Sequence, residues 1–457
     1  MNGAFLRSAW PYGNEGILIV TNLAEPRPWK QGALCLLGLG ILFFSSYNAA
    51  NWLASQRNHV PTLVFAWESL IPYWPWTIVP YWSIDLFYVA SLFVCTTKRE
   101  LHTHAYRLLA IQLISVAFFV LTPLRYTFVR PETTGIFGAM LDALLLFDKP
   151  FNQAPALHIS LLVILWVCFA KHFTDTWRWL LHAWFALIGV SVVTTYQHHF
   201  FDVPTGLWAG WFCVWLFPER EKFGVSKFAS NADPHRARLA VIYFTAALLV
   251  GVAGILVDGW GLWLLWVAGA LLLVSLIYGF LDATAFQKDG EGRISMASFW
   301  LLAPYRLGAW ANSRWWTRHQ PNACAITPEV WIGRMPGDSD TLPPKVYTLI
   351  DLCAELPCHA SSRAYQSLPA LDLIPLTTAQ LEDAAKSIAR AVARGPVMVC
   401  CALGYSRSAA AVAAWLIASD QVASAHDAAA LIRTARPQVK LHAQQCQALD
   451  NLARAHR

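Results

Sequence analysis

A cysteine and an arginine near the C-terminus have the residue types and the spacing of a phosphate site. Cys401 ends an apolar stretch that begins at Val397, and Arg407 follows six residues later, ahead of an alanine-rich segment that predicts a helix. Backbone N–H groups in a loop that leads into a helix stabilise a thiolate and bind an anion. Gly404 lets the backbone close around that anion, and Arg407 can fork two hydrogen bonds onto a phosphoryl group. A buried structural cysteine is the alternative, but the combined pattern favours a nucleophile at the floor of a phosphate cradle.

The segment from Cys401 to Ser408 resembles the signature of the cysteine-dependent protein tyrosine and dual-specificity phosphatases. The resemblance implies a phosphocysteine intermediate on Cys401, with Ser408 as hydrogen-bond donor to the departing thiolate in the second step. It also implies that the intervening loop binds the substrate phosphate, at Ala402, Leu403, Gly404, Tyr405 and Ser406. That family usually has histidine before the nucleophile, whereas this chain has Cys400; the positions of Gly404 and Arg407 assign the role to Cys401.

A phosphocysteine mechanism also needs an acid for the leaving oxygen, usually an aspartate on a loop before the nucleophile strand. Asp372 occupies that place, 29 residues before Cys401. Asp351 is the main alternative, but it stands at the end of a predicted strand, where this fold commonly has a structural polar residue. We therefore expect Asp372 to be the acid. The resemblance to the dual-specificity branch extends over residues 330–452.

The composition of the chain places the rest of it in a membrane. Of 457 residues, 56% are hydrophobic and only 14% charged, and 23 are tryptophan, a ring that favours bilayer interfaces. Lys and Arg are explained as topology signals facing an anionic leaflet, so no nucleic-acid partner is expected. No predicted external loop contains cysteine, which argues against a disulfide framework and for a reducing compartment around the tail.

Eight apolar windows are long enough to cross a bilayer of about 30 Å. They lie near residues 32–54, 75–97, 106–124, 156–172, 177–195, 203–217, 239–257 and 259–281. With the N-terminus inside, most Lys and Arg residues outside these windows fall on the internal side. The sequence thus predicts a multi-pass protein of the inner cell membrane with a cytoplasmic N-terminus and a cytoplasmic C-terminal domain.

The expected fold is a multi-pass α-helical membrane domain of about eight helices followed by a small α/β cysteine-phosphatase domain. Its segments are a cytoplasmic N-terminal tail at 1–31, the polytopic membrane domain at 32–281, an interfacial linker at 282–325 and the tail domain at 326–457. Within the tail domain, strands are predicted near 329–333, 346–352 and 397–400, and helices near 378–394, 408–419, 425–435 and 442–455. The linker, with its pair Trp315 and Trp316, either lies on the inner leaflet or packs on the tail domain.

Two histidines at the outer ends of predicted helices form a second candidate site. A carboxylate four residues after a histidine, as Asp202 follows His198, orients the imidazole for attack on phosphorus. His158, across the site, can protonate a leaving alcohol, and Arg125 and Arg130 in the preceding external loop can hold the anion.

This second set resembles the type 2 phosphatidic acid phosphatase superfamily, closest to its inositol phosphotransferase-like branch, over residues 32–217. The resemblance implies that His198 is the nucleophile, Asp202 its orienting partner and His158 the acid. In that superfamily a serine usually occupies the place of Ala156 and an arginine that of Val192, and the first motif has a longer spacing than Arg125 to Arg130.

The sequence therefore predicts a bifunctional membrane phosphatase. One site hydrolyses or transfers lipid phosphate in the bilayer, and the other hydrolyses phosphomonoesters of lipid or protein in the cytoplasm. Two alternatives stay open: a catalytically silent membrane half that acts as a lipid-binding anchor, and a tail domain that senses phosphate and controls the membrane enzyme. Neither half has a metal-ligand cluster, so no metal or other cofactor is expected. Membrane lipids are the expected partners, and the oligomeric state is not assigned.

Overall fold

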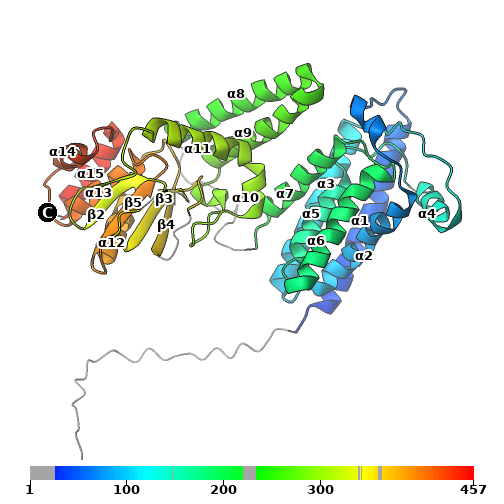
Figure 1. Cartoon of the computed structure of the whole chain (residues 1–457), viewed down its shortest axis with the longest axis horizontal. Helices are drawn as coiled ribbons and strands as arrows, with labels where there is room; N and C mark the ends of the chain where they lie inside the picture. Colours follow the sequence, from blue (N-terminus) through cyan, green and yellow to red (C-terminus); the bar gives the residue numbers. More distant parts are fainter. Residues whose placement is uncertain are drawn as a thin grey trace, which may run out of the picture.

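The computed structural model describes residues 26–146, 148–219, 233–337, 340, 342–358 and 363–456. Residues 1–25 of the predicted N-terminal tail lie outside this range. The described chain forms a helical bundle, a separate helical hairpin and a small α/β domain, which follow one another along the molecule (Figure 1).

The bundle contains the first seven α-helices, mostly lying side by side (Figure 1). They are α1 (Trp29–Ser55), α2 (Ile78–Val94), α3 (Lys98–Leu121), α4 (Gly135–Leu145), α5 (Leu157–Phe169), α6 (Asp175–Thr194) and α7 (Asp202–Leu216), with the short 3-10 helices η1 (Ala66–Leu70) and η2 (Pro75–Thr77) before α2. Helices satisfy their backbone polar groups internally, which is what a segment in a bilayer requires. Polar residues end the apolar runs: the Thr97 hydroxyl, for instance, accepts from the backbone N–H of Glu100 and caps α3.

Among the described residues, six helices are long and apolar enough to cross a membrane, not the eight predicted. They are Trp29–Ser55, Pro75–Val94, Lys98–Leu121, Asp175–Thr194, Pro234–Val257 and Gly259–Gly279. The windows predicted at 156–172 and 203–217 form α5 and α7, with 13 and 15 residues, whereas a span needs roughly 20. The two windows were themselves shorter than a span, and α5 ends at Phe169, inside its window.

A helical hairpin, α8 (Pro234–Val257) and α9 (Leu264–Gly279), follows the bundle, with the 3-10 helix η4 (Gly259–Trp263) at its turn. The Ser275 hydroxyl donates to the Ala240 carbonyl at 2.7 Å and fixes the register of the two helices. Arg236 donates to the carbonyls of Tyr278, at 3.0 Å, and Ile277, at 3.2 Å, so its charge caps the C-terminus of α9. The outer faces of the hairpin expose many large apolar side chains, as expected of helices that face lipid.

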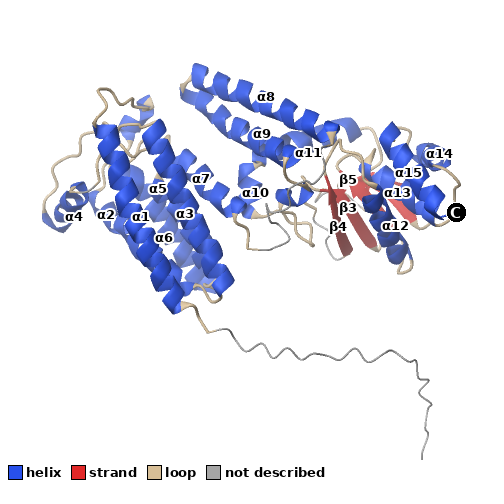
Figure 2. Ribbon diagram, turned by 180° about the vertical axis from the view of Figure 1, so that it is seen from behind, coloured by secondary structure: helices blue, strands red, loops and turns tan. Residues whose placement is uncertain are grey.

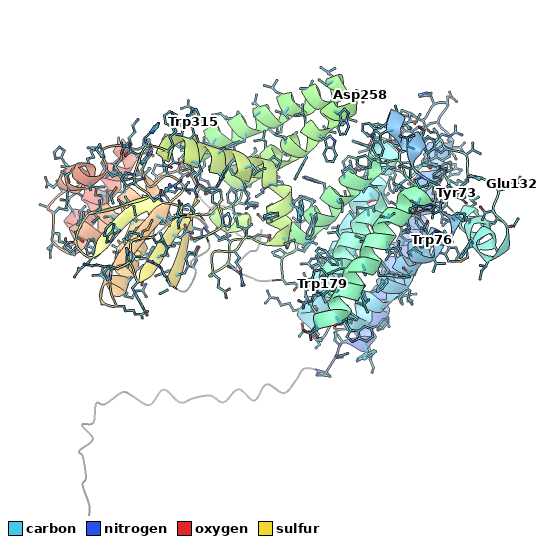
Figure 3. All side chains as sticks on the ribbon, in the orientation of Figure 1. Tyr73, Trp76, Glu132, Trp179, Asp258 and Trp315 are labelled. Carbon is cyan, nitrogen blue, oxygen red and sulfur yellow. The ribbon has the colours of Figure 1, made fainter. Side chains whose placement is uncertain are left out.

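The linker packs on both of its neighbours through the 3-10 helix η5 (Ala283–Phe286) and the helices α10 (Met296–Leu301) and α11 (Ala303–Thr317). On the bundle side, the indole of Trp215 donates to the Ala285 carbonyl at 2.9 Å. On the other side, Arg314 donates to the Met335 carbonyl at 3.1 Å. Trp315 and Trp316 remain 63% and 64% exposed, and Trp315 lies along the same edge of the molecule as the hairpin (Figure 3).

The tail domain is built on a five-stranded sheet with the order β1-β2-β5-β3-β4, in which only the edge strand β1 is antiparallel. The strands are β1 (Ala323–Ala325), β2 (Val330–Arg334), β3 (Thr348–Cys353), β4 (Ala364–Ala370) and β5 (Val397–Cys401). Helices α12 (Thr378–Val392), α13 (Arg407–Ala418), α14 (Ala425–Ala435) and α15 (Ala443–His456) complete the domain, and α12 lies in front of the strands (Figure 2). The small α/β domain is thus confirmed. Strands β1 and β4 were not predicted: β1 has three residues, and β4 lacks alternation and contains a proline.

Alternation along β5 separates the two consecutive cysteines. Val399 and Cys401 belong to the core that the sheet shares with α12 and α13, whereas Met398 and Cys400 belong to the core on the opposite face, where Ala309 of α11 packs. Successive side chains of a strand point to opposite faces, so only one of the two cysteines can face the loop that follows. That residue is Cys401.

Candidate active site

The nucleophile predicted from the sequence lies where β5 ends. The Cys401 sulfur is 3.3 Å from the Ser408 hydroxyl, and the backbone N–H of Gly404 donates to the sulfur at 3.3 Å. Ser408 belongs to the first turn of α13, so the positive end of that helix also faces the sulfur. These contacts bring together three of the residues that the sequence predicted, Cys401, Gly404 and Ser408.

Gly404 has a structural reason to be glycine. Its φ is +76°, and a Cβ there would lie 2.6 Å from the Gly333 carbonyl group and 2.9 Å from the Arg334 nitrogen. The phosphate loop, residues 401–407, therefore closes directly against β2, and any side chain at this position would push the two apart.

Residues outside the phosphate loop contact the remaining residues of the loop, Ala402, Leu403, Tyr405 and Ser406. The Ser313 hydroxyl donates to the Ala402 carbonyl, Arg436 donates to the Leu403 carbonyl at 2.9 Å, and the Tyr405 hydroxyl donates to the Trp316 carbonyl at 3.1 Å. The Ser406 hydroxyl lies 3.4 Å from the Gln445 carboxamide oxygen. Because these contacts use carbonyls and side chains, they shape the loop without occupying its backbone N–H groups.

Arg407 is buried and is positioned by an acidic residue that the sequence analysis did not identify. Its guanidinium donates to both carboxylate oxygens of Glu355, at 2.7 and 3.0 Å, and to the Ala370 carbonyl at 2.9 Å. Although burial opposes ionisation of Glu355, the charge of Arg407 holds the pKa of that carboxyl below its usual value. Glu355 comes just after β3, and an acidic residue beyond the carboxyl end of a buried parallel strand was the signal available.

Asp372 lies at the same guanidinium. Its carboxylate is 3.0 Å from Arg407 Nη2, and its side chain is 32% exposed, which leaves one face open. Burial raises the pKa of Asp372, and Glu355 adds to this, while Arg407 opposes it. Leu373, next in the chain, has a φ of +60°, a left-handed conformation that is uncommon for a branched side chain. Asp372 is therefore placed where an acid could reach an oxygen of a phosphoryl group bound to Arg407.

Asp351 lies on the opposite side of the sheet. It pairs with Cys400 across the parallel strands β3 and β5 and has no exposed surface. Its carboxylate forms an ion pair with Lys288 of the linker, and it accepts from the Tyr365 hydroxyl at 2.7 Å and from the Cys353 N–H at 2.7 Å. These contacts fit the structural role that the sequence analysis gave to this residue.

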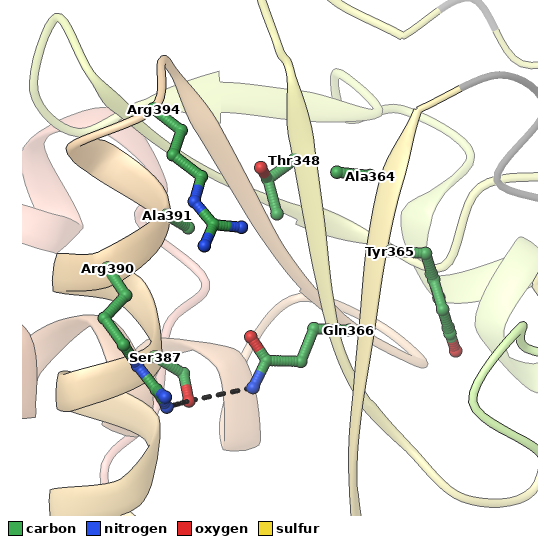
Figure 4. A pocket seen from close by; sticks show the side chains of 8 residues that line it. All are labelled: Thr348, Ala364, Tyr365, Gln366, Ser387, Arg390, Ala391 and Arg394. Atoms are coloured by element: carbon green, nitrogen blue, oxygen red, sulfur yellow. Dashed lines mark hydrogen bonds between the residues drawn. The ribbon is translucent and has the colours of Figure 1, made fainter. Parts of the chain in front are cut away.

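A hollow of about 150 Å³ between the sheet edge and α12 is separate from this site (Figure 4). Arg390 and Arg394 line it, and the Gln366 carboxamide donates to the Ser387 hydroxyl at 3.0 Å within it. Cys401 and Arg407 do not line it, so the phosphate loop and not this hollow is the candidate active site.

Three residues of the second predicted set, His158, His198 and Asp202, lie near one another in the bundle. His198 Nδ1 lies 3.2 Å from the Asp202 carboxylate, and both side chains are buried. The side-chain amide of Gln153, with its nitrogen toward Asp202, lies 2.9 Å from the same carboxylate oxygen. His158 stacks on the Tyr81 ring at a centroid distance of 4.0 Å and is close enough to His198 for their charges to interact.

Several polar atoms of this cluster are buried and have no hydrogen-bond partner within the described part of the chain. They are His158 Nε2, Arg130 Nη1, the Tyr81 hydroxyl, Asn152 Oδ1 and Gln197 Nε2. Leaving such groups unpaired is costly, so a polar ligand that reached them would gain hydrogen bonds. Arg125, by contrast, is exposed, and its backbone N–H donates to the Pro61 carbonyl at 2.9 Å.

The two departures from the membrane superfamily lie inside this cluster. Ala156 and Val192 have no exposed surface and pack with Tyr81 and Ile78 in one apolar cluster. The backbone N–H of His198 donates to the Val192 carbonyl at 3.1 Å. Both positions are thus part of an apolar cluster.

The adjacent histidine has a structural role. His199 Nδ1 lies 3.0 Å from the buried carboxylate of Glu68, and the Thr127 N–H donates to His199 Nε2 at 3.2 Å. Glu68 also accepts from the Phe200 N–H at 2.9 Å. The two ring nitrogens of this histidine thus both have partners within the protein.

Residues 346–454 match the family model described as the dual specificity phosphatase catalytic domain. No curated protein matches the sequence significantly. Similar solved structures include human DUSP28, 22% identical over 30% of this chain and 95% of that chain, with a TM-score of 0.27. PTPMT1 in complex with PI(5)P is 21% identical over 30% of this chain and 96% of that chain, with a TM-score of 0.28. Tk-PTP in the active form is 24% identical over 29% of this chain and 97% of that chain, with a TM-score of 0.28. The family match confirms the dual-specificity part of the predicted resemblance and does not extend into the membrane half.

Proposed function

We propose that this chain, a phosphatase of phosphomonoesters with a dual-specificity phosphatase catalytic domain at residues 346–454, dephosphorylates membrane lipids through a phosphocysteine at Cys401. The observation that carries the proposal is the convergence of five groups at one loop. The Cys401 sulfur contacts Ser408 and the Gly404 N–H, and Arg407 lies in the same loop with Asp372 at its guanidinium.

The reaction proceeds in two displacements at phosphorus. In the first, the Cys401 thiolate attacks the phosphoryl group, the bond to the leaving oxygen breaks, and Asp372 gives that oxygen its proton. In the second, the Asp372 carboxylate takes a proton from water, the water oxygen attacks phosphorus, and the phosphorus–sulfur bond breaks. Arg407 and the loop N–H groups stabilise the charge on the phosphoryl oxygens throughout, and Ser408 donates a hydrogen bond to the departing thiolate.

The surroundings of the site support a lipid substrate over a phosphorylated protein. The Ala402 carbonyl contacts α11, and the Tyr405 hydroxyl reaches the Trp316 carbonyl of the same helix, whose Trp315 and Trp316 are more than half exposed. Tryptophan side chains of this kind favour the bilayer interface. A phosphate loop attached to such a helix lies where lipid phosphates of the inner leaflet are presented. Phosphoprotein is the alternative substrate class.

A second activity is proposed for the cluster in the bundle, because His158 Nε2 and Arg130 Nη1 are buried there without partners among the described residues. In this proposal His198 attacks a lipid phosphate, Asp202 orients the imidazole, and His158 protonates the leaving alcohol. The phosphoryl group then passes to water or to another alcohol. The apolar Ala156 and Val192 favour the alternative, a silent lipid-binding anchor for the phosphatase domain.

The proposed arrangement in the membrane separates the two sites. We place the protein in the inner cell membrane with the N-terminus and the phosphatase domain in the cytoplasm, from the distribution of Lys and Arg in the sequence. If α5 and α7 also cross the membrane despite their length, as the topology with eight crossings requires, the histidine cluster faces the outer side and the two sites act on separate pools of lipid.

Purified full-length protein in bilayers tests both activities with one panel of lipid monophosphates, a phosphopeptide and phenyl phosphate. We expect lipid monophosphates to be the best substrates and Cys401→Ser to remove most of the turnover. Turnover that survives in Cys401→Ser should disappear in the Cys401→Ser/His198→Ala double variant and persist in a matched Cys401→Ser/His102→Ala control, since His102 is exposed at the start of α3. Preference for the phosphopeptide would contradict the lipid assignment, and no residual turnover in Cys401→Ser would support the anchor.

A further inference from the structure

The loop that carries Asp372 is attached to the membrane hairpin. The acid loop, residues 371–375, connects β4 to α12, and the hydroxyl of Tyr278 in α9 donates to the backbone carbonyl of Asp372 at 3.0 Å. Tyr278 is 1% exposed and lies one residue before the end of α9. A buried tyrosine needs a partner for its hydroxyl, and here the partner is the main chain of the acid itself.

Apolar contacts reinforce this attachment on both sides of Asp372. Leu371 and Ile374 pack in the cluster that contains Tyr278, Leu281 and Phe286 of the hairpin and linker. Ala354, beside the Arg407 partner Glu355, belongs to the same cluster. Leu371 and Ile374 are therefore held by the hairpin and linker, whereas Ala370 and Leu376, at the two ends of the loop, pack in the core that the sheet shares with α12 and α13.

The hairpin can serve as a fixed support because hydrogen bonds from α8 hold the C-terminal end of α9 in place. Arg236 of α8 donates to the carbonyls of Tyr278 and Ile277, and Ser275 of α9 donates to the Ala240 carbonyl. The Tyr278 ring also packs on Tyr243 at a centroid distance of 5.4 Å. A displacement of the Tyr278 hydroxyl thus requires the two helices to move relative to one another.

From these contacts we propose that Tyr278 is a positioning residue for catalysis. Through the carbonyl of Asp372, the α8–α9 hairpin holds the acid against the phosphate bound at Arg407, so that the phosphatase reaches full acid catalysis only when the hairpin is in place. The proposal rests on the role of Asp372 proposed above. It assigns to two membrane helices a part in the cytoplasmic reaction.

The test uses the dependence of kcat/KM on the leaving group, which separates acid catalysis from every other contribution. A phenolate with strongly electron-withdrawing nitro groups leaves without help from an acid, whereas phenolate itself needs the proton. Full-length Tyr278→Phe in bilayers should lose about tenfold in kcat/KM for phenyl phosphate, the size expected for a misplaced acid, and keep its value for dinitrophenyl phosphate. Tyr243→Phe, which removes a hydroxyl from the same aromatic group, is the matched control and should keep both values.

Asp372→Asn measured in parallel separates this proposal from the one on which it rests. It should show the same pattern with a larger loss; equal values for both substrates in Asp372→Asn would overturn the role of Asp372, whatever Tyr278 does. With Asp372→Asn as expected, unchanged ratios in Tyr278→Phe, or an equal loss for both substrates, would overturn the role of Tyr278. Should Tyr278→Phe fail to fold, Ile374→Ala takes its place, because it loosens the same loop from the hairpin side, and the same outcomes apply.

Discussion

Replacing Cys401 with serine is expected to abolish hydrolysis of aryl phosphates by the tail domain, lowering kcat by about a thousandfold or more, as removal of a nucleophile does in other enzymes. The serine hydroxyl is a far weaker nucleophile than a thiolate at neutral pH. Binding of inorganic phosphate or vanadate should persist, because Arg407 and the loop N–H groups are unchanged. Steady-state kinetics with p-nitrophenyl phosphate and calorimetric titration of vanadate measure the two effects.

Cys400→Ser is the matched control for this prediction. Cys400 has no exposed surface and lies on the opposite face of β5, in the cluster with Met398 and Leu349. Its replacement should lower the thermal stability slightly and leave kcat of the folded protein within about twofold, as for changes away from the reacting groups. Loss of activity in Cys400→Ser with retention in Cys401→Ser would show that the register of the phosphate loop is wrong.

Asp372→Asn is expected to lower kcat/KM for phenyl phosphate by about a hundredfold or more, the usual contribution of a general acid. It should also change the pH profile. Because burial raises the pKa of Asp372, the wild-type acid stays protonated to higher pH than an ordinary aspartate, and activity falls as the pH rises through that pKa. Asparagine does not titrate, so this alkaline decline should be absent from the variant.

The matched control for Asp372→Asn is Asp351→Asn, because Asp351 is the alternative candidate for the acid. Asp351 is paired with Lys288 and faces away from Cys401, so its replacement should lower stability and keep the alkaline decline. An alkaline decline that survives in Asp372→Asn and disappears in Asp351→Asn would reverse the assignment.

The phosphate loop could be predicted from sequence because strand, loop and helix are contiguous. Cys401, Gly404, Arg407 and Ser408 lie within eight residues, and local chemistry alone constrains them. Glu355 could not be assigned in the same way, since its contact with Arg407 joins residues 52 positions apart and depends on how β3 and β5 pair. Topology, not composition, brings these two side chains together.

The membrane half shows the same limit. Apolar windows predicted six helices of membrane length that the structure contains, but the two shortest windows correspond to α5 and α7, which are shorter than a membrane span. His198 and Asp202 are four positions apart in the sequence, so their contact was predictable. The pairing of His199 with Glu68, by contrast, joins residues 131 positions apart. The bond from Tyr278 to the acid loop spans 94 positions and had no sequence signal at all.

Mapping the phosphoenzyme tests the central claim most directly. In Asp372→Asn, p-nitrophenyl phosphate still delivers its phosphoryl group because its leaving group needs little help, while the second displacement lacks its base, so the intermediate accumulates. Rapid quenching followed by mass spectrometry of peptides should find one phosphoryl group per chain on Cys401 and none in a Cys401→Ser/Asp372→Asn variant. A phosphoryl group found instead on Cys400 or on His198 alone, or product formation without any phosphoenzyme, would contradict a phosphocysteine mechanism at Cys401.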